Sequence, residues 1–493
     1  MTHSTLLTLL LTTPLAAAFL PLAERLLPHL QQIARLLEDF RTQPVTPAAT
    51  RDFELRLQEL LRHVGLDLTD WSFNHLETGP LPQRLHHDGQ RYRRRDPSPN
   101  TIATLCGPIR VWRQLYEDLE PGNPCLFPLE RRLGIVAGAA TPALAERASW
   151  WLAQHPQGST LDLLARDHDV GWSAETLRNV TAAFAAGLEA QRPAAQVEQV
   201  LEWLRQASAS RGRHRPSLVV GRDGIHLPMR TGQAYKEGAT ATLTVYDRRG
   251  RRLGTVYLGR MPQPGQGTLS VQLTALIEAV LGQWSGALPR LAYVTDDGYQ
   301  PATYFRRVLS RLHHPRTGEH LEWQRVVDFY HAALYVQQLA DALFGDNTKK
   351  GRQWARRMRR RLKEKDGLKR VLQAATYHRQ MRRLSAKRES AFEKAYGYLR
   401  GNRKWMAYWR YQGVGLPIGS GVTEAGCKTV FTQRLKQSGM RWEVPGGQVV
   451  VTLRVVLLSG VWESAVARRL ASQTFPWPGV KQPSAPPTLE TAA

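Results

Sequence analysis

The run RLAYV at residues 290–294 limits the fold of this 493-residue chain more than any other stretch. Its apolar residues do not alternate with polar ones, which is typical of a strand buried on both faces of a sheet. Strand character also marks residues 217–221, 239–246, 252–258 and 326–327, with the turn DRRGRR before the third of them and an amphipathic helix predicted over 269–284. The sequence therefore predicts an α/β core.

The rest of the chain is organised around this core, and its length predicts two to four domains. We expect an α+β, multidomain fold with a helical N-terminal half. The predicted parts are a helical N-terminal region (1–87), a small β-containing module (88–138) whose best hairpin lies within TIATLCGPIRVWRQLYEDL, a helix-turn-helix-like region (139–191), a polar linker (192–215), a first part of the core (216–344), a basic helical insertion (345–412), a second part of the core (413–471) and a disordered tail (472–493).

The charge of the chain points to a polyanionic partner. Lys and Arg number 67 against 42 Asp and Glu, which gives a formal net charge of +25 and a pI near 10.4. Residues 6–21 are apolar, but Pro14 interrupts them and no basic residue precedes them, so we do not expect a signal peptide. Beyond residue 21, no stretch approaches the ~18 uninterrupted apolar residues of a membrane span. These features favour nucleic acid over a membrane.

Most of the excess charge lies in residues 345–412, which hold 22 Lys or Arg and 5 Asp or Glu, a net charge of +17. Arg356, Arg357, Arg359 and Arg360 form its densest cluster. The segment also contains Trp354, Tyr377, Tyr396, Tyr398, Trp405, Tyr408 and Trp409. A solvated basic face is the simple alternative, but this combination favours contacts with a phosphate backbone and stacking on bases.

Residues 161–184, LDLLARDHDVGWSAETLRNVTAAF, have the layout of a helix-turn-helix. Ala165 lies in an apolar helix, Gly171 falls where a tight turn is needed, and Ser173 can cap the next helix. That second helix could read DNA in a groove. An ordinary pair of packed helices fits the pattern equally well.

Three carboxylates are candidates for catalysis. Asp223 and Asp297 each follow a predicted strand and precede a glycine, and Glu424 follows the Gly-Ser-Gly turn at 419–421 in the first turn of a predicted helix. Sheets of this kind build ligand sites at the ends of their strands, and convergent carboxylates suit Mg²⁺. The alternatives are Asp-Gly turns and a glutamate that complements a helix dipole.

Basic residues follow Glu424 along the same predicted helix. They are Lys428, Arg434, Lys436 and Arg441, and we expect them to contact DNA.

Two further pairs of residues have simpler interpretations. Asp328 and His331, in VVDFYHAALYV, fit a helix N-cap followed by a packed histidine. Cys106 and Cys125 belong to no C-x-x-C motif, so core thiols are favoured over a zinc site. With only three cysteines, the chain fits a reducing cytosol.

Four motifs of this chain, taken in order, resemble the motifs of a known protein family. GRDGIHLPMR, YVTDDGYQPATYF, VVDFYHAALYV and PIGSGVTEAGCKTVFTQRLKQSGMRW are similar to the ordered signature of ISKra-type bacterial insertion-sequence transposases, which are distantly Mutator-like. The similarity runs from about Thr101 to about Val461. Its most specific part is the last motif, with GSG, Glu, Cys-Lys and QR-x-K-x-SGMRW.

This resemblance implies an RNase H-like catalytic core that carries a DDE triad of Asp223, Asp297 and Glu424, with Asp328 and His331 in supporting positions. It implies two Mg²⁺ ions, for which Mn²⁺ can substitute, and cleavage of DNA at insertion-sequence ends followed by strand transfer. The partners would be transposon ends and target DNA, bound by a homodimer or higher oligomer in the bacterial cytoplasm at the nucleoid.

The sequence departs from the group's pattern in two places. It reads TDDG, so Asp296 competes with Asp297 for the second position, and the cysteine-rich upstream module is reduced to Cys106 and Cys125. A structure-selective RNase H-like nuclease and a non-catalytic DNA-binding protein derived from a transposase are the alternative functions.

Overall fold

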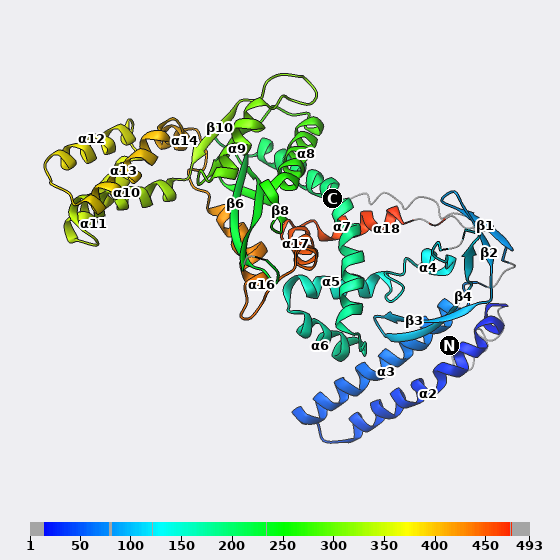
Figure 1. The fold of residues 1–493 in the computed structure, drawn as a ribbon. Coiled ribbons are helices and arrows are strands. Elements are labelled where there is room, and N and C mark those ends of the chain that lie inside the picture. Colours follow the sequence, from blue (N-terminus) through cyan, green and yellow to red (C-terminus); the bar gives the residue numbers. More distant parts are fainter. Residues whose placement is uncertain (1–13, 78–80, 121, 233, 474, 476–493) are drawn as a thin grey trace. The chain divides into compact units, whose positions relative to one another are not determined.

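The computed structural model describes residues 14–77, 81–120, 122–232, 234–473 and 475 (Figure 1). The chain divides into two compact units. Unit 1 comprises residues 1–184 and 468–493, and unit 2 comprises residues 185–467. The predicted tail (472–493) lies almost entirely outside the described residues.

The described part of unit 1 begins with a helical hairpin. Helices α2 (Pro14–Thr42) and α3 (Pro47–Asn74) are antiparallel and pack along their length. Thr46 caps α3 by accepting the backbone N–H of Ala49, and the rings of Phe40 and Phe53 stack 4.3 Å apart next to the turn. In the described residues, the predicted helical character of the N-terminal region is confirmed.

A small β-module follows. Strands β1 (Arg84–His87), β2 (Gln90–Arg94) and β5 (Tyr116–Asp118) form one sheet, and β3 (Ser98–Thr104) and β4 (Gly107–Arg113) form an antiparallel hairpin. Buried Ile102, Ile109 and Val111 of the hairpin pack against Leu66 and Phe73 of α3 and against α4 (Pro128–Leu133). The hairpin predicted within this module is therefore confirmed.

Three helices complete unit 1 and lead into unit 2: α5 (Pro142–Gln154), α6 (Gln157–His168) and α7 (Ala174–Ala209). Helix α6 ends at Asp169, which has a left-handed φ of 56°, and Ser173 Oγ accepts the N–H of Thr176 at 3.1 Å. The predicted Ser173 cap is confirmed, whereas the left-handed residue of the connection is Asp169 and not Gly171, where the tight turn was expected. A DNA-reading role for α7 stays a prediction.

The linker predicted over 192–215 is wrong, because α7 is a 36-residue helix that continues to Ala209. Val197, Val200 and Leu204 recur at three- and four-residue steps and are buried in the core of unit 2. These apolar residues make the segment a core helix despite its polar composition.

Unit 2 is built on a mixed five-stranded sheet with the order β10-β9-β6-β7-β8. Strands β6 (Ser217–Pro228), β7 (Tyr235–Tyr246) and β8 (Arg252–Arg260) are antiparallel, and β9 (Arg290–Thr295) and β10 (Trp323–Val327) run parallel to β6. The predicted α/β core is confirmed, and β9 is buried on both faces as its sequence indicated.

Two hydrophobic layers cover the sheet. Leu291 and Tyr293 of β9 belong to the layer formed with α7 and α8 (Gly267–Gln283), and Ala292 and Val294 belong to the opposite layer with α10 (Phe329–Phe344). Helices α15 (Gly421–Cys427) and α17 (Val444–Leu458) lie against β7 and β8, and α9 (Tyr299–Arg307) follows β9 (Figure 1). The predicted packing of the apolar segment after residue 447 is confirmed.

The basic insertion consists of helices. They are α11 (Lys349–Arg361), α12 (Gly367–Gln380), α13 (Ala386–Gly401) and α14 (Tyr408–Gly413), which pack on α10 around Trp354, Phe392 and Leu399 (Figure 1). Helix α18 (Trp462–Ser472) is the last helix of the described chain. In the described part of the chain, no single helix has the length and hydropathy of a membrane span; α17 and α18 reach them only together, with a bend of 115° between them.

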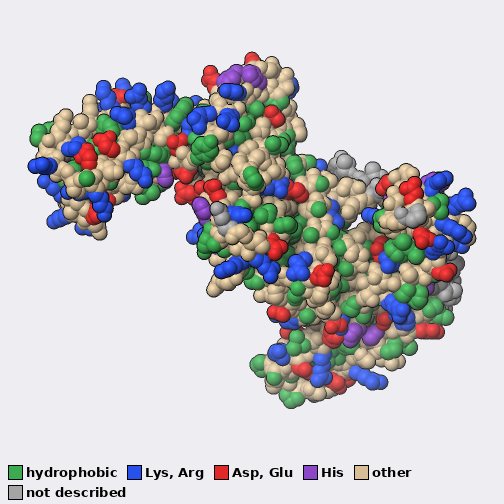
Figure 2. All heavy atoms as spheres, in the orientation of Figure 1, with side chains coloured by type: hydrophobic (Ala, Val, Ile, Leu, Met, Phe, Trp, Pro, Cys, Tyr) green, Lys and Arg blue, Asp and Glu red, His purple; other side chains and the backbone are tan. Residues whose placement is uncertain are grey.

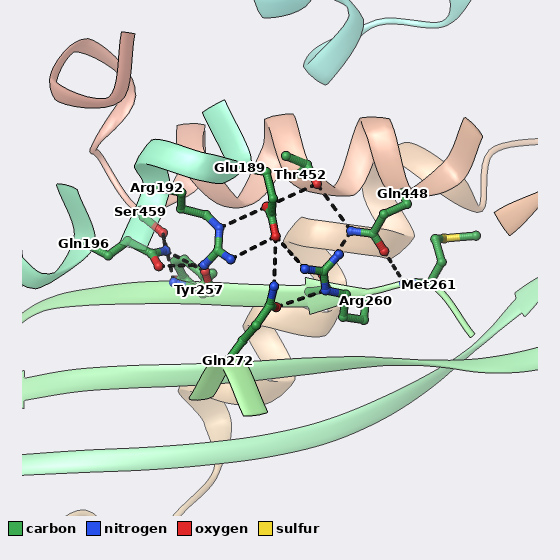
Figure 3. A network of polar contacts seen from close by, with 11 residues as sticks. Glu189, Arg192, Gln196, Tyr257, Arg260, Met261, Gln272, Gln448, Thr452 and Ser459 are labelled. Atoms are coloured by element: carbon green, nitrogen blue, oxygen red, sulfur yellow. Dashed lines mark hydrogen bonds and ion pairs between the residues drawn. The ribbon is translucent and has the colours of Figure 1, made fainter. Parts of the chain in front are cut away.

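A polar network fixes α7 and α17 to the sheet (Figure 3). The Glu189 carboxylate pairs with Arg192 and Arg260 and accepts the Gln272 amide at 2.9 Å. Burial alone would raise the pKa of Glu189, but the two guanidinium groups and the amide lower it below its ordinary value. This half-buried carboxylate is therefore ionised, and with the Thr452 hydroxyl of α17, which donates to it at 3.5 Å, it joins α7, α8, α17 and β8.

Candidate active site

Three carboxylates from three separate elements line one cavity of about 410 Å³ in unit 2. Asp223 comes from β6, Asp296 from the loop after β9 and Glu424 from α15. His331 and Arg359, from α10 and α11, line the same cavity. The fold thus gathers acidic residues separated by some 200 positions in the sequence.

Asp223 lies where β6 leaves its parallel neighbour. The last β6–β9 pair joins Val220 to Tyr293, while Asp223 still pairs with Thr240 of β7. The strand was predicted to end near residue 221, but pairing with β7 carries it to Pro228. Asp223 is therefore held in the sheet by β7 on one side, while its other side is no longer paired with β9.

A glycine on β6 lets α15 approach the sheet. A Cβ at Gly221 would lie 1.9 Å from Thr423 Oγ1, which no packing tolerates. The hydroxyls of Thr423 and Thr242 are 2.8 Å apart and fix the helix to β7. Because Glu424 follows Thr423, this close contact brings its side chain to the cavity beside Asp223.

Ser420 connects Glu424 to a buried aspartate. Its hydroxyl lies 2.6 Å from Glu424 Oε1 and 2.8 Å from Asp328 Oδ2, and its backbone N–H also donates to Asp328 Oδ2. Asp328 is fully buried and caps α10 by accepting the N–H of His331 at 2.5 Å. The predicted N-cap is confirmed, and the contact with the Gly-Ser-Gly turn is an addition that spacing did not reveal.

The second aspartate of the site needs a correction. Asp297, the residue expected at the site, has a left-handed φ of 72° and pairs its carboxylate with buried Arg325; it is not among the residues that line the cavity. Asp296 lines the cavity instead, and its Oδ1 accepts the N–H of Gly298 at 3.0 Å. The alternative that the TDDG sequence left open is therefore the one that the geometry favours.

Burial and the neighbouring carboxylates raise the pKa of one carboxyl group of the cavity. Burial raises the pKa of Asp223, and the negative charges of Asp296 and Glu424 raise it further. The Cys427 thiol and the N–H of Gly224 donate hydrogen bonds that oppose this rise. Like charges that share a cavity disfavour each other's ionisation, and a nearby positive charge relieves this repulsion.

The donor set fits magnesium by its chemistry. Asp223, Asp296 and Glu424 offer hard oxygen atoms with no thiolate among them, the ligands that Mg²⁺ prefers. In the part of the chain that the structure describes, no three such side chains stand close enough to hold one ion as a group. Glu424 is exposed at the cavity and its carboxylate is held by the Ser420 hydroxyl, so this side chain would have to move toward the two aspartates for one ion to contact all three.

An aromatic residue that the sequence suggested for base stacking instead supports the site. Tyr398 of α13 donates its hydroxyl to the Asp296 carbonyl at 3.0 Å, and its ring stacks on Tyr335 at 3.7 Å and contacts His331. The basic insertion is thereby tied to the loop that carries Asp296. Sequence reasoning missed this role because an aromatic residue among arginines gave no sign of an inward orientation.

The basic residues after Glu424 separate into two groups. The helix continues through a π-helical turn (Lys428–Thr432) and a last turn (Gln433–Leu435). Lys428, Lys436 and Arg441 are exposed. Arg434 is 1% exposed, its guanidinium lies over the Trp442 ring, and burial lowers its pKa to about 10. The prediction that Arg434 contacts DNA is therefore corrected, because its side chain is part of the core.

The arginine cluster of α11 also divides. Arg356, Arg357 and Arg360 are exposed, and Lys and Arg side chains are spread over the surface of the insertion (Figure 2). Arg359 is half-buried, donates to Gln337 at 3.1 Å and lines the carboxylate cavity. The cluster thus presents three cations to solvent and one to the site.

Few of the aromatic residues of the insertion are available for stacking. Trp354 and Tyr408 are buried, whereas Tyr377 and Trp409 are 56% and 43% exposed. These two residues, with Tyr396, line a second cavity of about 720 Å³ that Lys369 and Arg403 also border.

Upstream, Cys106 is half-buried and Cys125 exposed, and no metal-binding group includes either of them among the described residues.

No protein-family model matches the chain, and a search of the curated proteins gives no match. An assignment of function therefore depends on the site itself.

Proposed function

We propose that the protein is a DDE transposase that cleaves DNA at insertion-sequence ends and joins the ends to target DNA. The observation that carries this proposal is the convergence of Asp223, Asp296 and Glu424 at one cavity. The motif resemblance supplies the family, with Asp296 in the position first expected for Asp297. The strand order, with three antiparallel strands followed by two parallel ones, agrees with an RNase H-like core.

The three carboxylates would hold Mg²⁺, which when bound stabilises the entering and leaving oxygens of an in-line displacement at phosphorus. Asp223 contributes a fixed position, because it is paired within the sheet. Ser420 orients Glu424, and Asp328 in turn holds Ser420. Arg359 places a positive charge at the same cavity, where it suits a phosphate oxygen.

DNA would bind along the exposed basic surface of unit 2. Lys428, Lys436 and Arg441 are exposed after Glu424, and the insertion exposes further arginines on α11, namely Arg356, Arg357 and Arg360. Such contacts act on the backbone and weaken with salt. Tyr377 and Trp409 would stack on unpaired bases at the cavity between α12 and α14.

A strand-transfer assay tests the proposal. DNA that flanks the reading frame, which should contain the inverted repeats, is supplied as labelled ends together with a supercoiled target plasmid and Mg²⁺. We expect nicked ends and joined products with the wild type, and neither with Asp223→Asn. Nicking without joining would contradict the transposase proposal and favour the nuclease. DNA binding without nicking would favour a non-catalytic descendant.

A further inference from the structure

Helix α2 carries an apolar stripe that the hairpin does not use. Leu20, Leu27, Leu30 and Leu37 are 48%, 53%, 55% and 46% exposed, and Ala23 and Ala34 between them are exposed as well. The residues that α2 turns toward α3 are different ones, such as Leu22, Leu36 and Phe40. Helix α2 therefore has two apolar faces, and α3 covers one of them.

The spacing of this stripe is that of a coiled-coil seam. Its six residues follow one another at steps of three, four, three, four and three, which is the alternation of a and d positions in a heptad repeat. The stripe runs over 18 residues, from Leu20 to Leu37, or about 26 Å of helix. Pro21 and Pro28 lie in the same helix but are not among the six residues of the stripe.

The stripe also reads the same in both directions. Its order is Leu, Ala, Leu, Leu, Ala, Leu, and the steps between the residues are symmetric about the midpoint between Leu27 and Leu30. An antiparallel copy of the same helix would therefore place Leu20 opposite Leu37 and Ala23 opposite Ala34. A surface that is complementary to itself under a two-fold rotation is the condition for an isologous dimer.

The ion pairs that join α2 to α3 lie off the stripe. Arg25 pairs with Asp67 and Asp70 at 3.0 Å, and His29 contacts Asp67. A separate groove of about 500 Å³ on the hairpin is lined mainly by charged and polar residues. Association through the stripe would thus bury leucine and alanine side chains without taking these ion pairs out of water.

We propose that the α2 stripe binds the same stripe of a second copy of this chain, antiparallel and about a two-fold axis, so that two hairpins form a four-helix bundle. Ala23 and Ala34 let the helices approach closely, and Leu27 and Leu30 fill the centre. This interface does not depend on the catalytic proposal, although a dimer would bring two DNA-binding units together.

Mass measurement on the full chain tests the surface. We expect the wild type to sediment at twice 55.6 kDa and the Leu27→Glu/Leu30→Glu variant at once that mass, with an unchanged circular dichroism spectrum. The matched control, Leu119→Glu/Leu470→Glu, alters two leucines that are 47% and 43% exposed elsewhere and should stay dimeric. A monomeric wild type, or a dimeric stripe variant, would overturn the proposal.

Cross-linking tests the register, and it does not rely on a disruptive variant. In a Cys125→Ser background, Ala23→Cys and Ala34→Cys chains are oxidised separately and as a mixture. The antiparallel seam predicts a disulfide-linked dimer in the mixture, far above that of either variant alone. Links within the separate Ala23→Cys sample that equal those of the mixture would indicate a parallel pairing and refute the arrangement.

Discussion

Two adjacent aspartates are expected to fail in different ways when each is replaced by asparagine. Asp296→Asn removes a carboxylate from the cavity, where its charge opposes the ionisation of Asp223. We expect the rate of strand cleavage to fall about 10³-fold or more, on the order of 4 kcal/mol in activation free energy. Stability should be unchanged or higher, because one of several like charges is gone.

Asp297→Asn should instead lower the stability of the protein and leave strand cleavage largely intact. Its carboxylate neutralises Arg325, whose side chain is 5% exposed and lies against the rings of Phe305 and Trp405. Removing one partner of a buried ion pair costs about 3–5 kcal/mol, which corresponds to a fall in Tm on the order of 10 °C. Cleavage per folded molecule should persist at a temperature well below this Tm.

The assay combines single-turnover cleavage of a supercoiled plasmid with thermal unfolding of the same two preparations. A variant pair in which Asp297→Asn abolishes cleavage while Asp296→Asn cleaves like the wild type would refute the placement of Asp296 at the site. Equal losses of both cleavage and Tm in the two variants would refute the separation of their roles.

Three further predictions concern residues around the site and the DNA surface. Burial first, and then the charge of Asp296, raises the pKa of Asp223. The folded state therefore binds this proton more tightly than the unfolded state does. The stability that the bound proton provides is lost as the pH rises through the folded pKa. Metal-free Asp223→Asn should accordingly have a higher Tm than the wild type at pH 7, a difference that shrinks in acid, and Mg²⁺ should raise the Tm of the wild type only; equal Tm values at pH 7 would contradict this. Ser420→Ala removes a hydrogen bond to a charged group, worth about 1.5–3 kcal/mol, so kcat should fall about 10- to 100-fold with little change in DNA affinity, and a fall below twofold would exclude the orienting role. Tyr377→Ala and Trp409→Ala should each weaken binding of a labelled single-stranded oligonucleotide by about 1–3 kcal/mol and leave duplex binding nearly unchanged; loss of duplex binding alone would show that the rings do not stack on bases.

The core of the fold could be predicted because its signals are local. Apolar runs without alternation marked the buried strands, and the DRRGRR turn marked the hairpin between β7 and β8. The true length of β6 could not be predicted, because pairing with β7, not apolar character, carries it past Asp223.

The site was harder to predict, because its details depend on partners far away in the sequence. Nothing near TDDG shows that Arg325 will pair with Asp297 and leave Asp296 at the cavity. Arg434 was misplaced for the same reason. A basic residue among other basic residues predicts a surface position, but the Trp442 ring and the surrounding core enclose this side chain.

The most direct test of the central claim is single-turnover plasmid cleavage by Glu424→Gln in Mg²⁺, with DNA binding measured on the same samples. Glutamine keeps the size of the side chain and its contact with the Ser420 hydroxyl but removes the charge. We predict that strand cleavage disappears while DNA affinity stays within about twofold of the wild type, because Glu424 belongs to the carboxylate set and not to the basic surface. A Glu424→Gln protein that cleaves at the wild-type rate would contradict the assignment of Asp223, Asp296 and Glu424 as one catalytic site.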